Sequence, residues 1–252
     1  MPVANLNTYR TVGLRVQSSA FASQGQATML ENAVLQKVQQ SCSFTQVTHA
    51  GSTPADVVLD LNITNTGRGG SGWIKNQNEA TIDTLLVLSD GQSGELLGTA
   101  RIHGSSSGMI INNSVPENEA IDAVAKSVAE LLAKSGCFGP RVAKAEPAPT
   151  PDPPATGSGA TPDDAKRHDA EQLNEQGKEK LRGADIAGAL AAFQQANTLV
   201  PDARYEYNVC LAYEAQEKWS NAIEACKQAR AMKPEARLVA KIDHRLELLK
   251  NR

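Results

Sequence analysis

The chain has 252 residues, of which 40% are apolar, and a formal charge of -3. This length and composition predict two modest domains with hydrophobic cores, and no apolar run approaches the roughly 20 residues of a membrane-spanning helix. Because there is no excess of positive charge to neutralise phosphates, we expect no nucleic-acid partner and no charge-driven binding to membranes.

Residues 8–139 carry the patterns of an α+β domain. Apolar and polar positions alternate over residues 12–16, 57–63, 80–88 and 96–102, which predicts four strands with one buried face each. Helical spacing over residues 29–38 and 121–132 predicts two helices. The order β-α-β-β-β-α, with hairpin loops at 67–72 and 90–94 and room for another strand at 109–111, favours an antiparallel sheet with both helices on one face.

Few residues of this domain suggest chemistry. Asp56, Asp60 and Asp83 lie opposite the apolar alternation, so we expect them to face solvent rather than to form an acid–base pair. Cys42 and Cys137 each follow a predicted helix. A disulfide between them is compatible with neighbouring helix ends, and two buried free thiols are the alternative.

The strand at residues 9–16, the helix after it and the hairpin at 85–96 resemble small domains of bacterial envelope lipoproteins. These include curli-secretion lipoproteins, lipoprotein activators of penicillin-binding proteins and the amino-terminal domain of the Tol β-propeller protein. The resemblance implies a periplasmic, outer-membrane-associated protein with a lipidated cysteine just upstream of Met1. Membrane contact would then come only through this lipid anchor, which is absent from the sequence. The first residues lack a secretory signal, which fits a processed mature chain or an ordinary cytosolic start.

Residues 140–165 are predicted to form a linker. Seven of the twelve prolines lie between residues 140 and 162, and Gly157, Ser158 and Gly159 follow the densest run of them. Proline favours extended chain and the Gly/Ser segment favours flexible coil, so this composition cannot build a core. We expect a semi-stiff spacer between two domains.

An internal repeat appears after the linker, over residues 166–252. Its matched positions, 33 residues apart, are Ala189 and Ala222, Phe193 and Cys226, Ala196 and Ala229, and Pro201 and Pro234. These residues resemble the tetratricopeptide repeat family, with Gly177 and Cys210 at the small position of each first helix. Ile186 and Trp219 take the bulky position that opens each second helix. The resemblance implies two helix pairs, and Leu238, Ile242, Leu246 and Leu249 predict a capping helix after them.

The family resemblance also implies a binding face, because the first helices of such arrays line a concave groove. Projected onto this sequence, the groove would be lined by Asn174, Lys178, Tyr207, Asn208 and Leu211. Such a short groove suits a peptide tail or a single helix of a protein partner. The alternative is that these side chains are merely solvated.

One string is typical of serine hydrolases, because residues 104–108 read G-x-S-x-G with Ser106 as nucleophile. That motif needs a strand, a tight turn and then a helix, whereas residues 109–114 read as extended chain or loop.

The four histidines show no metal-ligand spacing, and we expect no metal or cofactor. The sequence therefore predicts a non-enzymatic interaction or scaffold protein of the bacterial envelope. A cytosolic tetratricopeptide adaptor and a hydrolase using Ser106 are the alternatives.

Overall fold

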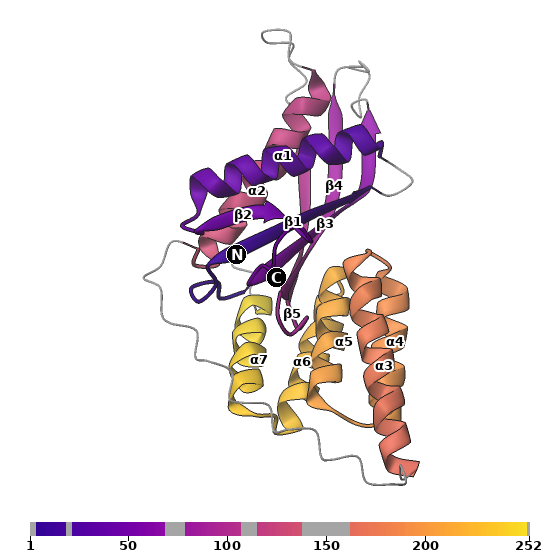
Figure 1. Ribbon diagram of the computed structural model, residues 1–252. Coiled ribbons are helices and arrows are strands. Elements are labelled where there is room, and N and C mark those ends of the chain that lie inside the picture. The colour runs from indigo at the N-terminus through magenta and orange to yellow at the C-terminus, as the bar shows by residue number, and fades with distance from the viewer. Residues whose placement is uncertain (1–3, 19–21, 69–78, 107–114, 138–161, 251–252) are drawn as a thin grey trace. The chain divides into compact units, whose positions relative to one another are not determined.

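The computed structural model describes residues 4–18, 22–68, 79–106, 115–137 and 162–250 (Figure 1). These residues belong to two compact units, one containing a sheet and the other only helices. An α+β domain followed by a helical array is therefore confirmed. The predicted linker lies outside the described residues as far as residue 161, and its last residues, 162–165, instead form the first turn of a helix. None of the described helices is long and apolar enough to cross a membrane.

The described residues of the first unit form five strands and two helices. They are β1 (Thr11–Ser18), α1 (Gln24–Ser41), β2 (Gln46–His49), β3 (Val57–Arg68), β4 (Ala80–Asp90), β5 (Leu96–Ser105) and α2 (Pro116–Lys134). All four predicted strands and both helices are present. The sequence patterns missed β2, which has only four residues and no fully buried side chain. The predicted strand at residues 109–111 lies outside the described residues.

The prediction of a purely antiparallel sheet is wrong for its first strand. The strand order is β2-β1-β3-β4-β5, and β1 runs parallel to both β2 and β3, with Val12 opposite Val47 on one side and Val57 on the other. Only β3, β4 and β5 pair antiparallel. The reason is α1, because a helix between two strands returns the chain to the end of the sheet from which it started.

Both helices of this unit pack on one face of the sheet, and α1 and α2 lie side by side there (Figure 1). The alternate apolar positions of the strands and the apolar stripes of the helices meet in one core. Its members include Leu14, Leu59, Leu61, Leu86, Leu30, Val34, Val124 and Val128. Each such side chain contributes roughly 1.5–3 kcal/mol when fully buried, so this core is the main stabilising element of the unit.

A disulfide joins Cys42 to Cys137 at the ends of α1 and α2, with 5.2 Å between their Cα atoms. The adjoining backbone is also tied, because Ser43 donates its amide hydrogen to the carbonyl of Cys137 at 3.1 Å. The bond closes a loop of 95 residues. It holds together the two helices that cover the sheet.

The three aspartates predicted to face solvent have structural partners. The expectation that Asp60 faces solvent is wrong, because its buried carboxylate accepts a hydrogen bond from Arg15 Nε at 2.7 Å. Asp56 Oδ2 accepts from the backbone amide of Thr11 at 2.9 Å, next to the start of β1. Asp83 is partly exposed and pairs with His103 across β4 and β5 at 2.7 Å.

The second unit consists of five helices in its described residues. They are α3 (Pro162–Arg182), α4 (Ile186–Leu199), α5 (Ala203–Ala215), α6 (Trp219–Ala231) and α7 (Ala236–Leu249). Ile186 and Trp219, the predicted bulky openers, are the first residues of α4 and α6. Pro201 and Pro234 fall between helices, after α4 and after α6. Helix α7 coincides with the expected capping helix, and Leu238, Ile242 and Leu249 are buried.

The backbone of this unit repeats as its sequence does. Ala184 and Glu217, which are 33 residues apart, both have positive φ angles, of 63° and 59°. Each lies in the short turn that joins the two helices of a pair, α3 to α4 and α5 to α6. Left-handed backbone is uncommon for residues other than glycine, so its recurrence at matched positions shows that both pairs turn in the same way.

Candidate functional site

The two helix pairs are held closed at matched positions by different chemistry. In the first pair, a Cβ atom added to Gly177 would lie 2.6 Å from Cδ1 of Phe193, so the ring of α4 packs directly on the backbone of α3. In the second pair, the matched residues Cys210 and Cys226 form a disulfide between α5 and α6, with 5.2 Å between their Cα atoms. The first contact brings α3 close to α4, and the second brings α5 close to α6. The predicted binding face lies on α3 and α5.

The sequence-based prediction missed this disulfide. It assigned Cys210 to the small packing position of the repeat, and it matched Cys226 with Phe193, at a position that usually holds a large side chain. A signal was present. The two cysteines have a separation of 16 residues, which is also the separation of Gly177 and Phe193, the residues that touch in the preceding pair. Two cysteines at positions known to be in contact can be bridged without moving the backbone.

The five residues predicted to line the binding face lie on two neighbouring helices, Asn174 and Lys178 on α3, and Tyr207, Asn208 and Leu211 on α5. Asn208 Nδ2 donates to Asn174 Oδ1 at 2.8 Å, so the structure brings the two asparagines together. Lys178 Nζ is paired with Glu175 at 2.6 Å on its own helix. The alternative that these five side chains are merely solvated is wrong, because all five are buried.

Further contacts fix α3 beside α5. Glu171 accepts hydrogen bonds from the hydroxyl of Tyr205 at 2.9 Å and from Arg204 Nη2 at 3.3 Å. Burial, together with the hydrogen bond to Glu171, raises the pKa of Tyr205 to about 12, so its hydroxyl stays protonated and donating at neutral pH. These bonds hold the predicted face in one arrangement.

Helix α7 is bonded to α5 as well. Arg245 Nη1 donates to Glu214 Oε1 at 3.2 Å. Burial is the largest influence on the pKa of Arg245 and lowers it, but the charges of and hydrogen bonds to Glu214 and Tyr207 together outweigh burial, so the pKa is raised and the guanidinium stays charged. The capping helix is thus fastened to the helix that carries Tyr207, Asn208 and Leu211.

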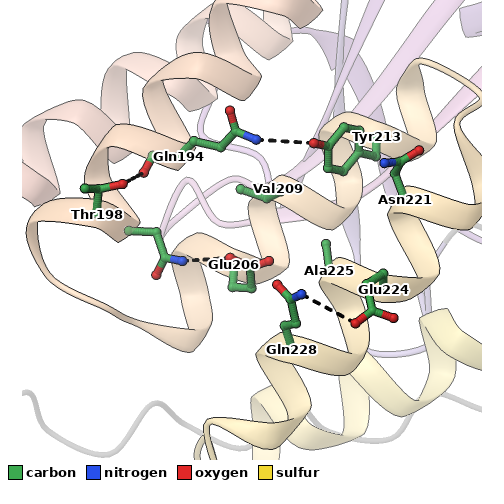
Figure 2. Close-up of a pocket in the computed structure, with 10 residues that line it drawn as sticks. Gln194, Thr198, Glu206, Val209, Tyr213, Asn221, Glu224, Ala225 and Gln228 are labelled. Atoms are coloured by element: carbon green, nitrogen blue, oxygen red, sulfur yellow. Dashed lines mark hydrogen bonds between the residues drawn. The ribbon is translucent and has the colours of Figure 1, made fainter.

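A polar pocket of about 440 Å³ opens between α4, α5 and α6 (Figure 2). Its lining residues are Gln194, Asn197, Thr198, Glu206, Val209, Tyr213, Asn221, Glu224, Ala225 and Gln228. Val209 and Ala225 directly precede the two cysteines of the disulfide, which therefore sets the spacing of two pocket walls. Sequence reasoning did not identify this pocket, because its members come from three helices and form no motif.

Hydrogen bonds order the pocket walls (Figure 2). Gln194 Nε2 donates to the hydroxyl of Tyr213 at 3.2 Å, which links α4 to α5. Asn197 Nδ2 donates to Glu206 Oε2 at 2.7 Å. Burial raises the pKa of Glu206, because desolvation disfavours its charged form.

The hydrolase alternative finds no support at Ser106. Its Oγ accepts a hydrogen bond from the backbone amide of Ala80 at 2.9 Å, and its own amide donates to the carbonyl of Ala80. Ser106 thus extends the pairing of β4 with β5. Residues 107–114, which would have to form the helix that follows the nucleophile, lie outside the described residues. Among the residues that are described, no group of three or more His, Cys, Asp or Glu side chains is placed to hold a metal ion.

No protein-family model and no curated protein matches this chain. Solved structures do match it at low identity. A PelC dodecamer from Paraburkholderia phytofirmans is 13% identical, with a TM-score of 0.39 over 52% of this chain and 93% of that one. Protein XCC0632 from Xanthomonas campestris is 13% identical, with a TM-score of 0.39 over 51% and 86%. A minor lipoprotein from Acinetobacter baumannii is 12% identical, with a TM-score of 0.34 over 50% and 94%. At such TM-scores, nothing about the function of this chain follows from the similarity.

Proposed function

We propose that this protein is a non-enzymatic interaction or scaffold protein of the bacterial envelope, and that its helical unit is a short tetratricopeptide array that binds a protein partner. The sheet unit would dock at one site while the array recruits the partner. The proposed partner-binding face consists of Asn174, Lys178, Tyr207, Asn208 and Leu211.

The observation that carries this proposal is the repeated construction of the helix pairs. Matched positions have the same backbone turn, at Ala184 and Glu217. A contact between helices also recurs at matched positions, between Gly177 and Phe193 and between Cys210 and Cys226. Stacked pairs of this kind present their first helices side by side as a binding surface. The hydrogen bond between Asn174 and Asn208 supports such an arrangement of α3 and α5.

The proposed envelope location is supported by the two disulfides. All four cysteines of the chain are paired, and each pair lies within one unit. Structural disulfides form and persist in oxidising compartments and are rare in a reducing cytosol. The pairing therefore favours the envelope over the cytosolic adaptor.

The proposal is tested by crosslinking in the native host. A photo-crosslinking amino acid is placed at Lys178 on the proposed face or at Lys227, an exposed position on α6. We expect one protein to be captured from Lys178 and not from Lys227. Lys178→Glu should then abolish recovery of that protein by the full chain, whereas Lys227→Glu, with the same charge change, should not.

Two results would contradict the proposed function. One is capture of the same proteins from both positions, or of none from either. The other is equal recovery of the partner by Lys178→Glu and Lys227→Glu, which would remove the face from the interaction.

A further inference from the structure

The pocket of Figure 2 lies on the opposite side of α5 from the proposed partner-binding face. Glu206, Val209 and Tyr213 are spaced three and four residues apart, so they share one side of the helix. Tyr207 and Leu211 are also four residues apart and lie on the other side. The pocket is therefore a separate surface, and it would keep its chemistry if the proposed face bound nothing.

The hydrogen bonds within the pocket leave several carboxylate and amide oxygens able to accept further bonds. A carboxylate only accepts, so Asn197 and Gln228 must turn their amide nitrogens toward Glu206 and Glu224, at 2.7 and 3.4 Å. The oxygen of Asn197 accepts the backbone amide of Asp202 at 3.0 Å. One of the two amide hydrogens of each of these side chains is thus engaged in the wall. The carboxylates and the oxygen of Gln228 remain to accept hydrogen bonds from a ligand (Figure 2).

The charge of the pocket is uncompensated within its walls. Two of the ten lining residues are glutamates, and none is Lys, Arg or His. Glu206 is only 8% exposed, and one of its oxygens takes no hydrogen bond from the described residues. An ionised carboxylate that is desolvated without a cation beside it costs free energy, and a bound cation would offset that cost.

We propose that this pocket binds the guanidinium group of an arginine side chain from a partner protein. A guanidinium is a planar group that carries only donors, and it pairs with carboxylates through two parallel hydrogen bonds. It therefore matches the two carboxylates and the amide oxygens of this lining. The volume of about 440 Å³ exceeds one side chain, so backbone that flanks the arginine enters the rim. A neutral sugar fits less well, because it carries no positive charge to pair with the two glutamates.

The proposal is tested by calorimetry on the full chain with blocked tripeptides at low salt, where charge interactions are least screened. The central residue is arginine, lysine, or citrulline, which has nearly the shape of arginine without its charge. We expect the arginine peptide to bind, the lysine peptide to bind more weakly, and the citrulline peptide not to bind. Added salt should weaken the arginine complex.

Variants locate the site. Glu206→Gln and Glu224→Gln should each weaken binding of the arginine peptide about tenfold or more, because each removes a charge-assisted hydrogen bond. Glu217→Gln makes the same charge change in the exposed turn between α5 and α6 and should leave the affinity unchanged. Circular dichroism checks that each variant is folded.

Several results would overturn the inference. They are equal binding of the arginine and citrulline peptides, unchanged affinity in Glu206→Gln and Glu224→Gln, and no binding of any peptide. Binding of N-acetylglucosamine that is lost in Glu206→Gln, without arginine binding, would assign the pocket to a carbohydrate. Loss of the crosslink at Lys178 bears only on the proposed function, since Lys178 does not line this pocket.

Discussion

The first helix pair of the helical unit is closed by an aromatic ring, and the second by a covalent bond. Phe193 is fully buried and fills the space over Gly177 by its volume. The disulfide of Cys210 and Cys226 stands at the same place and fills less volume, but it removes conformational freedom from the unfolded chain. The stability of the first pair should therefore depend on packing, and the stability of the second pair on whether its surroundings are oxidising or reducing.

The largest effect is expected from Phe193→Ala, which breaks the first contact. Emptying a fully buried aromatic site costs about 3–5 kcal/mol, because the transfer free energy is lost and a cavity remains. Urea unfolding of the full chain measures the loss, and hydrogen exchange by mass spectrometry should locate it in α3 and α4. Phe193→Leu, the milder change, should cost clearly less. Equal exchange increases in α5 and α6 would show that the two pairs are not distinct in this way.

The second contact is broken by the double change Cys210→Ala and Cys226→Ala. A disulfide that closes a loop of this size contributes about 2–4 kcal/mol, so the variant should lose that much stability, with faster exchange in α5 and α6. Reductant should have the same local effect on the wild type. Because the reductant also breaks the disulfide of Cys42 and Cys137, hydrogen exchange in α5 and α6 must be measured separately from exchange in α1 and α2.

Replacing the disulfide by the Gly–Phe contact of the first pair provides the control for that prediction. The double change Cys210→Gly and Cys226→Phe gives the second pair the chemistry of the first, so exchange in α5 and α6 should become insensitive to reductant. If reductant still loosened these helices, the disulfide would not be what closes the second pair.

Gly177→Ala should have an intermediate effect. The added methyl group would collide with the ring of Phe193, and overpacking of this kind costs about 1–3 kcal/mol, partly offset by the better helix propensity of alanine. Thermal unfolding measures the loss. The cost should shrink in a Phe193→Leu background, and purely additive effects would argue against direct contact.

The smallest effect is expected from Glu206→Gln, which probes the pocket beside the disulfide. Burial raises the pKa of Glu206 in the folded chain, so the wild type loses stability as the pH rises from the ordinary glutamate pKa through the raised one. The glutamine variant does not titrate there. It should be at least as stable as the wild type at pH 7, and the difference should vanish in acid.

Unfolding midpoints of wild type and variant between pH 4 and 8 measure this difference. Tyr213 and Glu224 are the other ionisable groups of the pocket, and Glu217→Gln controls for the change in net charge. A variant that is less stable than the wild type at pH 7, and equally so in acid, would show that the carboxylate of Glu206 stabilises the fold rather than costing stability.

Much of the architecture could be predicted from local patterns. Alternation at Leu59, Leu61 and Ile63 predicts a strand with one buried face, and the spacing of Val124 and Val128 predicts a helix stripe, because burial of one side imposes a period on the sequence. The positions of α4 and α6 follow from the internal repeat for the same reason. Such features depend on neighbours within a few residues or on a fixed interval.

The remaining features depend on residues that only the fold brings together. The parallel pairing of β1 depends on the path of α1, and β2 is too short to show a period. The pocket combines one side each of α4, α5 and α6, so no single stretch of sequence contains it.

By itself, the sequence determined two units with different periods and a repeat of 33 residues, because the geometry of helices and strands sets the spacing of apolar side chains along the chain. Tertiary structure decided the direction of β1, the bond between Cys210 and Cys226 and the acceptor-lined pocket around Glu206. Each of these features joins atoms on different helices or strands, and the spacing of residues along the chain does not determine how close such atoms lie in the fold.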